Sequence, residues 1–358
     1  MPCSLVMKNL EELTKVVDSG SNLDWGAAVE AAHLLASHDV EQAAKQDFLI
    51  ALSEKGESST EVGAFAATFR ELAVDPGVEA WAPEAIDVCG TGGDGAHTFN
   101  ISTAVSFILA AAGVPVFKHG NRSITSKCGS ADLMEALGFR LDAPHDQLRR
   151  SLEALNFCFF FAPSFHPAFK EIMPVRKALA ESGRRSIFNL LGPLINPGRP
   201  AFQLMGVFSE RWVQPIAAAL DAVGLKAGMV AHCAPEPGLD LDELSCVGNN
   251  TVAGFGRLQE EVGPILPESC GLEACQLDAL KGGDIDLNLA ILHDLFAGKL
   301  GGERTGLRDS ILLNAGVALW IAGKAETIGA GVSHAREILN SGRAKEWLAQ
   351  AQNFYAEH

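Results

Sequence analysis

Residues 87–103 read Asp-Val-Cys-Gly-Thr-Gly-Gly-Asp-Gly-Ala-His-Thr-Phe-Asn-Ile-Ser-Thr, and this stretch decides the fold. Its first residues continue an apolar run from Ala85 and predict a strand, its glycines predict a tight turn, and the apolar run at 104–112 predicts a helix. A strand that enters a helix through a glycine turn is typical of α/β proteins, where ligands bind at the carboxyl edge of the sheet.

The glycines of this turn suit a phosphate-bearing ligand. Gly90, Gly92 and Gly93 carry no Cβ, so they can adopt positive φ angles and let a ligand come close to the main chain. The helix that follows would point its free N–H groups and the positive end of its dipole towards the turn. A glycine turn alone also fits a simple connection between a strand and a helix. The residues expected to cap this helix are Asn100, Ser102 and Thr103.

A second polar loop, Lys118-His-Gly-Asn-Arg-Ser-Ile-Thr-Ser-Lys-Cys-Gly-Ser130, follows another short apolar strand at 114–117. Loops that follow successive parallel strands lie side by side at one edge of the sheet. Lys118 comes directly after the strand, where its ammonium could meet a phosphate, although a single lysine there also fits a solvated loop charge. Together the two loops would bring to one site Asp94, Asn100, Ser102, Thr103, Lys118, Asn121, Ser123, Ser126, Lys127 and Ser130.

Composition narrows the function classes. The chain has 358 residues, enough for two domains, and its 47% hydrophobic and 20% charged residues are typical of a globular protein with a sizeable core. Because a formal charge of −16 repels a polyanion, we expect no nucleic-acid partner. The sequence has no secretory signal and no apolar stretch long enough to span a membrane, so we expect a cytoplasmic protein without a membrane partner.

The pattern of elements predicts an α/β fold with a smaller all-helical part. Residues 7–73 have helical periodicity throughout, and a further helical segment at 164–183 could return to them. From residue 85 onward short apolar strands alternate with helices, which predicts a mainly parallel central sheet with flanking helices. The expected strands are 85–89, 114–117, 157–161, 203–208 and 228–233. The expected helices are 102–112, 130–137, 145–155, 211–223, 288–297 and a helical tail at 308–354.

Two further segments carry candidate site residues. Asp242 and Glu243 follow the strand at 228–233, and Mg²⁺ commonly binds one or two protein carboxylates together with substrate phosphates. Such a pair by itself also fits a solvated surface. Arg176 lies beside Pro174 on an otherwise apolar helix face, where its guanidinium could bind a small carboxylate in a bidentate pair. His166 alone fits a capping or packing role.

Several motifs in order resemble the anthranilate phosphoribosyltransferase family, from about Leu23 to Leu348. They are Gly90-Thr-Gly-Gly-Asp94, Asn100-Ile-Ser-Thr103, Lys118-His-Gly-Asn-Arg-Ser123, Gly129-Ser-Ala-Asp-Leu-Met-Glu-Ala-Leu-Gly138, His166-Pro167 and Phe188-Asn-Leu-Leu-Gly-Pro-Leu194.

The resemblance implies the fold of nucleoside phosphorylases and class IV phosphoribosyltransferases, with a helical domain at 1–80, a returning helical segment near 164–185, and an α/β domain at 81–358. It implies a homodimer that transfers the phosphoribosyl group from phosphoribosyl diphosphate to the amine of anthranilate. The products are N-(5-phosphoribosyl)anthranilate and diphosphate, in tryptophan biosynthesis.

The resemblance also implies roles for single residues. Those that would bind phosphoribosyl diphosphate are Gly90, Thr91, Gly92, Gly93, Asp94, Thr98, Asn100, Ser102, Thr103, Lys118 and Ser130. Those that would bind anthranilate are His119, Gly120, Asn121, His166, Arg176 and Gly192. Mg²⁺ would be held by Ser102, Asp242 and Glu243. No side chain is assigned as a general acid or base, because the neutral aromatic amine is already nucleophilic.

The chain departs from the family pattern in two places. The link from Arg176 to the Phe-Asn motif is longer than usual, which leaves Arg184 and Arg185 as alternative anchors for the acceptor carboxylate. The segment before Asp242 is also longer. Two other functions fit the same scaffold, a pyrimidine nucleoside phosphorylase and a non-catalytic nucleic-acid-binding paralogue. The first should have Lys-x-Ser-Thr-Gly-Gly where this chain has Cys-Gly-Thr-Gly-Gly-Asp, and the second should have a basic groove.

Overall fold

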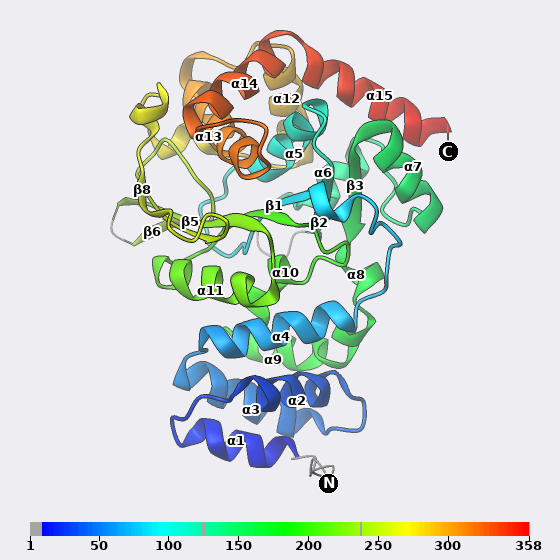
Figure 1. Ribbon diagram of the computed structural model, residues 1–358, viewed down its shortest axis with the longest axis vertical. Helices are drawn as coiled ribbons and strands as arrows, with labels where there is room; N and C mark the ends of the chain where they lie inside the picture. Colours follow the sequence, from blue (N-terminus) through cyan, green and yellow to red (C-terminus); the bar gives the residue numbers. More distant parts are fainter. Residues whose placement is uncertain (1–8, 123–126, 237, 358) are drawn as a thin grey trace.

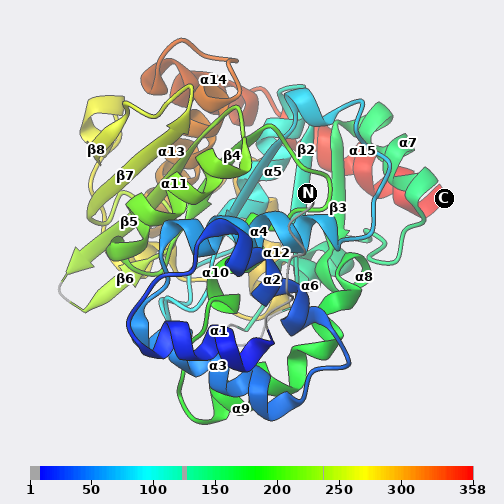
Figure 2. The same cartoon turned by 60° about the horizontal axis from the view of Figure 1, so that its bottom comes forward.

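The computed structural model describes residues 9–122, 127–236 and 238–357, and it stacks the chain in layers (Figure 1). A helical lobe lies at one end, a twisted sheet lies across the middle, and a second layer of helices covers the far face of the sheet. Figure 2 brings the helical lobe forward and shows α4 crossing in front of the sheet strands. None of the helices in the described ranges is both long and apolar enough to cross a membrane.

The helical lobe forms where helical periodicity was predicted. Helix α4 begins with a capping box in which Ser58 and Glu61 satisfy each other's free main-chain N–H groups. The buried Glu61 carboxylate also accepts from the Leu23 N–H at 2.9 Å and pairs with Lys55 at 2.8 Å, so it ties three helices together. The lobe consists of α1 (Leu10–Asp18), α2 (Trp25–Ala36), α3 (Gln42–Lys55), α4 (Ser59–Glu71) and the returning α9 (Met173–Glu181).

The returning segment is not one helix, and the prediction of a continuous helix over 164–183 is wrong. It divides into α8 (Ala162–Phe165), a 3₁₀ turn at Pro167–Glu171 and α9. The residue before a proline is pushed out of the helical region, and His166, which precedes Pro167, has φ −122° and ψ 68°. After the break the chain continues into the helical lobe, where the 3₁₀ turn contacts α2 and α9 contacts α3.

The five predicted strands are present, and they pair in parallel. The order across the sheet is β3-β2-β1-β4-β5-β7-β8, with β6 paired to β5. The strands β6, β7 and β8 are antiparallel additions that the sequence analysis missed. The bounds are β1 (Ile86–Gly90), β2 (Val116–Gly120), β3 (Phe157–Phe161), β4 (Phe202–Gly206), β5 (Ala227–Glu236), β6 (Leu239–Leu241), β7 (Asn249–Gly256) and β8 (Val262–Ile265).

Two hydrophobic cores sandwich the sheet. One packs the helices of the far layer against the sheet, and the other fills the space between the sheet, α10, α11 and the helical lobe. The second core is shared by the lobe and the sheet, so a domain division at residue 80 stays a prediction. The remaining helices are α5 (Ile101–Ala111), α6 (Ser130–Ala136), α7 (His145–Leu155), α10 (Phe188–Leu194), α11 (Val213–Val223), α12 (Ile285–Phe296), α13 (Thr305–Ile321), α14 (Ile328–Asn340) and α15 (Arg343–Glu357).

Candidate active site

A cavity of about 490 Å³ opens where the loops that follow β1, β2 and β6 meet. Three residues predicted for the phosphoribosyl diphosphate site, Thr91, Thr103 and Lys118, do not line this cavity. The Thr91 hydroxyl accepts from the Phe208 N–H at 3.0 Å. Thr103 is buried in α5, and Lys118 is buried in β2. The predicted donor and metal residues that do line the cavity are Gly90, Gly92, Gly93, Asp94, Thr98, Asn100, Ser102, Ser130, Asp242 and Glu243.

The glycine loop is shaped around a carboxylate. Gly92 and Gly93 have φ values of 70° and 79°, as expected, and the Gly92 N–H donates to Asp242 Oδ2 at 2.6 Å. Gly90 does not have a positive φ, because it stays in the extended strand β1. Its missing Cβ serves another purpose, since a Cβ there would stand 2.2 Å from Asp242 Oδ2.

The start of α5 differs from the predicted cap. Asn100 is the N-cap residue, but its side chain makes no capping hydrogen bond. Its Nδ2 donates to the Cys128 carbonyl at 3.1 Å, and its Oδ1 accepts from Asn288 at 2.9 Å. Asn100 therefore connects the start of α5 to Cys128 and to Asn288 of α12. These two partners take the place of the local capping hydrogen bond.

Lys118 is inside the sheet and not in a solvated loop. It lies within β2, where the side chain is 1% exposed. Its ammonium donates to the Val88 carbonyl at 3.0 Å and to the Ser102 hydroxyl at 3.3 Å. Burial lowers the pKa of Lys118, and the nearby acidic group of Asp87 opposes that shift. A buried ammonium is thus held between β1 and the start of α5.

The next residue, His119, faces the other side of the sheet and begins a chain of hydrogen bonds. Its Nδ1 lies 3.1 Å from the Gly192 carbonyl, and its Nε2 lies 3.2 Å from Nε2 of His166. Burial lowers the pKa of His119 to about 3 and that of His166 to about 4, so both rings are neutral at pH 7. Because a carbonyl only accepts, His119 carries its proton on Nδ1, and His166 then donates from Nε2. This assignment leaves Nδ1 of His166 as an acceptor.

Arg176 lies near these histidines on the side of the helical lobe. Its guanidinium stands 5.9 Å from the ring centres of both Phe169 and Phe188, and the Phe169 ring lies 5.6 Å from that of His166. Burial lowers the pKa of Arg176. The guanidinium lies beside these two rings, whose centres are 5.5 Å apart, and it keeps in-plane N–H donors available for a carboxylate.

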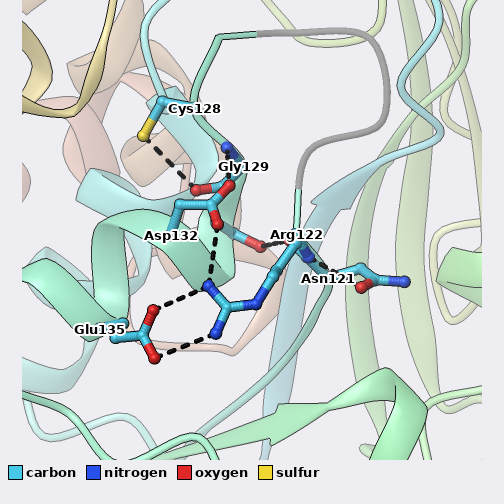
Figure 3. A network of polar contacts seen from close by, with 7 residues as sticks. Asn121, Arg122, Cys128, Gly129, Asp132 and Glu135 are labelled. Carbon is cyan, nitrogen blue, oxygen red and sulfur yellow. Dashed lines mark hydrogen bonds and ion pairs between the residues drawn. The ribbon is translucent and has the colours of Figure 1, made fainter.

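The other predicted anthranilate residues are less close to this group. Gly120 packs against the second loop, because a Cβ there would stand 2.3 Å from Ser130 Oγ. Asn121 is exposed, and its carbonyl accepts from the Ala131 N–H at 3.2 Å. Figure 3 shows the Arg122 guanidinium turned towards Asp132 and Glu135 of α6, with contacts of 3.1 and 2.7 Å. Ser123 and Ser126 lie outside the described residues.

The acidic pair sits at the bottom of the cavity, directly after β6. The Glu243 carboxylate accepts from the Thr98 hydroxyl at 2.9 Å. Burial, with added repulsion from Asp94, raises the pKa of Asp242 to about 7, and burial together with Asp242 raises that of Glu243 well above its ordinary value. One Asp94 oxygen, Oδ2, is buried without a hydrogen-bond partner. Crowded carboxylates with an unsatisfied oxygen fit a hard divalent cation.

No group of three or more acidic, histidine or cysteine side chains within the described ranges encloses a metal by itself. Mg²⁺ commonly binds one or two protein carboxylates, keeps several waters and takes its other ligands from substrate phosphates. The donor set therefore fits Mg²⁺ bound together with a phosphorylated substrate.

The comparisons with known proteins agree on one enzyme. Residues 82–345 match the family model described as glycosyl transferase family, a/b domain. Anthranilate phosphoribosyltransferase from Petrotoga mobilis is 40% identical over 342 residues, covering 96% of this chain and 95% of the relative. The crystal structure of anthranilate phosphoribosyltransferase from Thermus thermophilus is 39% identical, with a TM-score of 0.85 over 96% of this chain and 99% of that one.

The chain belongs to the anthranilate phosphoribosyltransferase family. Its activity is the one expected from the sequence, phosphoribosyl transfer to anthranilate in tryptophan biosynthesis, and the phosphorylase and nucleic-acid-binding alternatives have no support. The yeast anthranilate phosphoribosyltransferase in complex with phosphoribosyl diphosphate and Mg, at 24% identity and a TM-score of 0.82, shares the fold.

Gly206 lines the cavity and was not among the predicted site residues. A Cβ on Gly206, the last residue of β4, would stand 1.5 Å from the Asp242 carbonyl oxygen. A single glycine at a strand end was the only signal. The structure also separates the two alternative anchors, since Arg184 pairs with Glu54 on the surface at 2.6 Å whereas Arg185 lines the cavity.

Proposed function

We propose that this chain holds phosphoribosyl diphosphate in the cavity at the glycine loop, with Mg²⁺ on Asp242 and Glu243, and holds anthranilate beside His119, His166 and Arg176. The observation that carries the proposal is the position of β2. Lys118 donates to the Ser102 hydroxyl at the start of α5 on one face of the sheet, while His119 joins the histidine chain on the other. Donor and acceptor would then meet at the carboxyl end of this strand.

The donor half must stabilise a leaving diphosphate. Mg²⁺, when bound, neutralises charge on the diphosphate oxygens. The Lys118 ammonium adds a fixed positive charge in a dry site, where it costs no reorganisation as the C1–O bond breaks. The N–H groups of the glycine loop would contribute further donors. We expect Ser102 to complete the metal site, because it lines the same cavity as Asp242 and Glu243.

The acceptor half must hold a neutral amine and a carboxylate. Arg176 supplies a guanidinium for the anthranilate carboxylate. Nδ1 of His166, which can accept a hydrogen bond, faces away from the His119 contact. Because both histidines are neutral, neither repels the other or competes for the acceptor carboxylate. Closure of the helical lobe would bring the amine to the face of C1 opposite the diphosphate and exclude water.

The test is a fluorescence assay of anthranilate consumption in purified protein. We expect consumption only when both phosphoribosyl diphosphate and Mg²⁺ are present, with product that carries the phosphoribosyl group on nitrogen. Activity that survives EDTA would remove the metal from the proposal. The cytoplasmic location and the homodimer stay predictions.

A further inference from the structure

Arg185 connects the two parts of the molecule across the cavity. Its carbonyl oxygen accepts from the Ser53 hydroxyl of α3 at 2.9 Å, which fixes its main chain to the helical lobe. Its guanidinium lies 4.1 Å from the centre of the Phe208 ring, just after β4, and donates to the Gly93 carbonyl at 2.9 Å. The side chain thus reaches from the lobe onto the glycine loop.

The cavity needs more positive charge than its walls supply. Among the described residues that line it, the carboxylates are Asp94, Asp242 and Glu243, and Arg185 is the sole lysine or arginine. Phosphoribosyl diphosphate brings three phosphoryl groups into this space. Mg²⁺ and the buried Lys118 offset part of that charge, so an additional cation at the rim is electrostatically favoured.

The geometry of Arg185 suits this purpose. Stacking on Phe208 uses the face of the guanidinium, and one N–H is directed at Gly93, which leaves other in-plane donors for phosphate oxygens. The contact at Gly93 places these donors at the loop whose N–H groups would receive the diphosphate. Arg176, by contrast, lies beside Phe169 and Phe188 and does not line the cavity.

We infer that Arg185 is a further binding residue for the donor, contacting its diphosphate and drawing the helical lobe onto the loaded glycine loop. The inference rests on the proposed function and assigns Arg185 to the donor, not to the acceptor carboxylate. A ligand shifts a conformational equilibrium only through contacts that differ between the two states. A diphosphate held by both the loop and a residue anchored on α3 would provide such a difference.

The experiment compares Arg185→Gln and Arg185→Lys with Arg184→Gln, the matched control. Arg184 is the adjacent residue and is 47% exposed, and its partner Glu54 lies on the outside of the lobe. Kinetic constants for both substrates and calorimetric binding of inorganic diphosphate with Mg²⁺ are measured for each variant.

We expect Arg185→Gln to raise KM for phosphoribosyl diphosphate and to weaken diphosphate binding by roughly ten- to a hundredfold, the range for a hydrogen bond to a charged group. KM for anthranilate should change less than about twofold, and Arg185→Lys should fall between, because lysine keeps the charge but not the paired donors. Arg184→Gln should match the wild type.

Other outcomes overturn the inference. A rise in KM for anthranilate alone would show that Arg185 binds the anthranilate carboxylate. An equal rise in KM for both substrates would show that Arg185 only stabilises the structure between the lobe and the sheet. Unchanged constants and unchanged diphosphate binding would leave it no role in the site. If instead the wild-type protein consumes no anthranilate with any donor, the proposed function itself fails, and diphosphate binding still reports on Arg185.

Discussion

Replacing Gly206 with alanine tests whether the acidic pair is positioned by the end of β4. The new Cβ would stand 1.5 Å from the carbonyl oxygen and 2.1 Å from the carbonyl carbon of Asp242. A carbon and an oxygen approach no closer than about 3.0 Å, so the main chain must separate there by about 1.5 Å. Because a misplacement of about 1 Å can cost on the order of a hundredfold in rate, kcat should fall at least that far.

The assay is the initial rate of anthranilate consumption at saturating substrates, repeated over a range of Mg²⁺ concentrations. Gly90→Ala should lower kcat as well, because its Cβ would stand 2.2 Å from Oδ2 and 2.8 Å from the main-chain oxygen of Asp242, the proposed metal ligand. Gly329→Ala is the control, since no atom lies within 4 Å of a Cβ at that helical position. A folded Gly206→Ala enzyme with kcat within about threefold of wild type would refute the reasoning.

Four further predictions follow from the site. Arg176→Ala should raise KM for anthranilate about ten- to a hundredfold and barely change that for phosphoribosyl diphosphate, and an equal rise for both would misplace the carboxylate anchor. Glu243→Gln should lower turnover on the order of a hundredfold at low Mg²⁺, whereas a near-normal rate would move the metal elsewhere. Because burial holds the pKa of His166 at about 4, the unfolded chain binds more protons below its ordinary value of 6.5. The free energy of unfolding should therefore decrease as the pH falls from about 6.5 to 4, and this decrease should be larger in wild type than in His166→Leu by up to about 3 kcal/mol. Denaturant titration at each pH measures it. Parallel pH profiles for the two proteins would contradict the burial argument. Sedimentation at micromolar concentration should show a homodimer formed through the helical lobe, and a monomer would reject that contact.

Much of the fold was predictable because local patterns agree with the final structure. The parallel strands β1, β2 and β4 are short and end in glycine, and the helical tail breaks at Gly323 and Gly342, which have φ values of 71° and 81°. The antiparallel strands β6, β7 and β8 were not predicted because their residues give only weak strand signals. The segment 249–256 mixes asparagine and glycine with few apolar residues, and it is stabilised by pairing with β5.

The site was predictable as a set of residue types but not as a set of contacts. Glycines, a lysine and an acidic pair could be assigned to one edge of the sheet from their order along the chain. That Gly206 must lack a Cβ depends on how close the Asp242 main chain comes to β4, which no local pattern encodes. Asn100 makes its hydrogen bonds with Cys128 and Asn288, which lie 28 and 188 residues away in sequence. The role of Asn100 therefore could not be predicted from neighbouring residues.

The placement of Lys118 and His119 as neighbours on one strand makes the chemistry sensitive to register. Side chains alternate between the two faces of a sheet, so a shift of β2 by one residue would exchange the two. The imidazole would then face Val88 and Ser102, and the ammonium would face Gly192 and His166. The paired strands on both sides hold this register, since Val116 pairs with Ile86 of β1 and all five residues of β2 pair with β3. In the proposed arrangement, strand pairing keeps the two substrate sites apart, so an insertion or deletion inside β2 should abolish the use of both substrates at once.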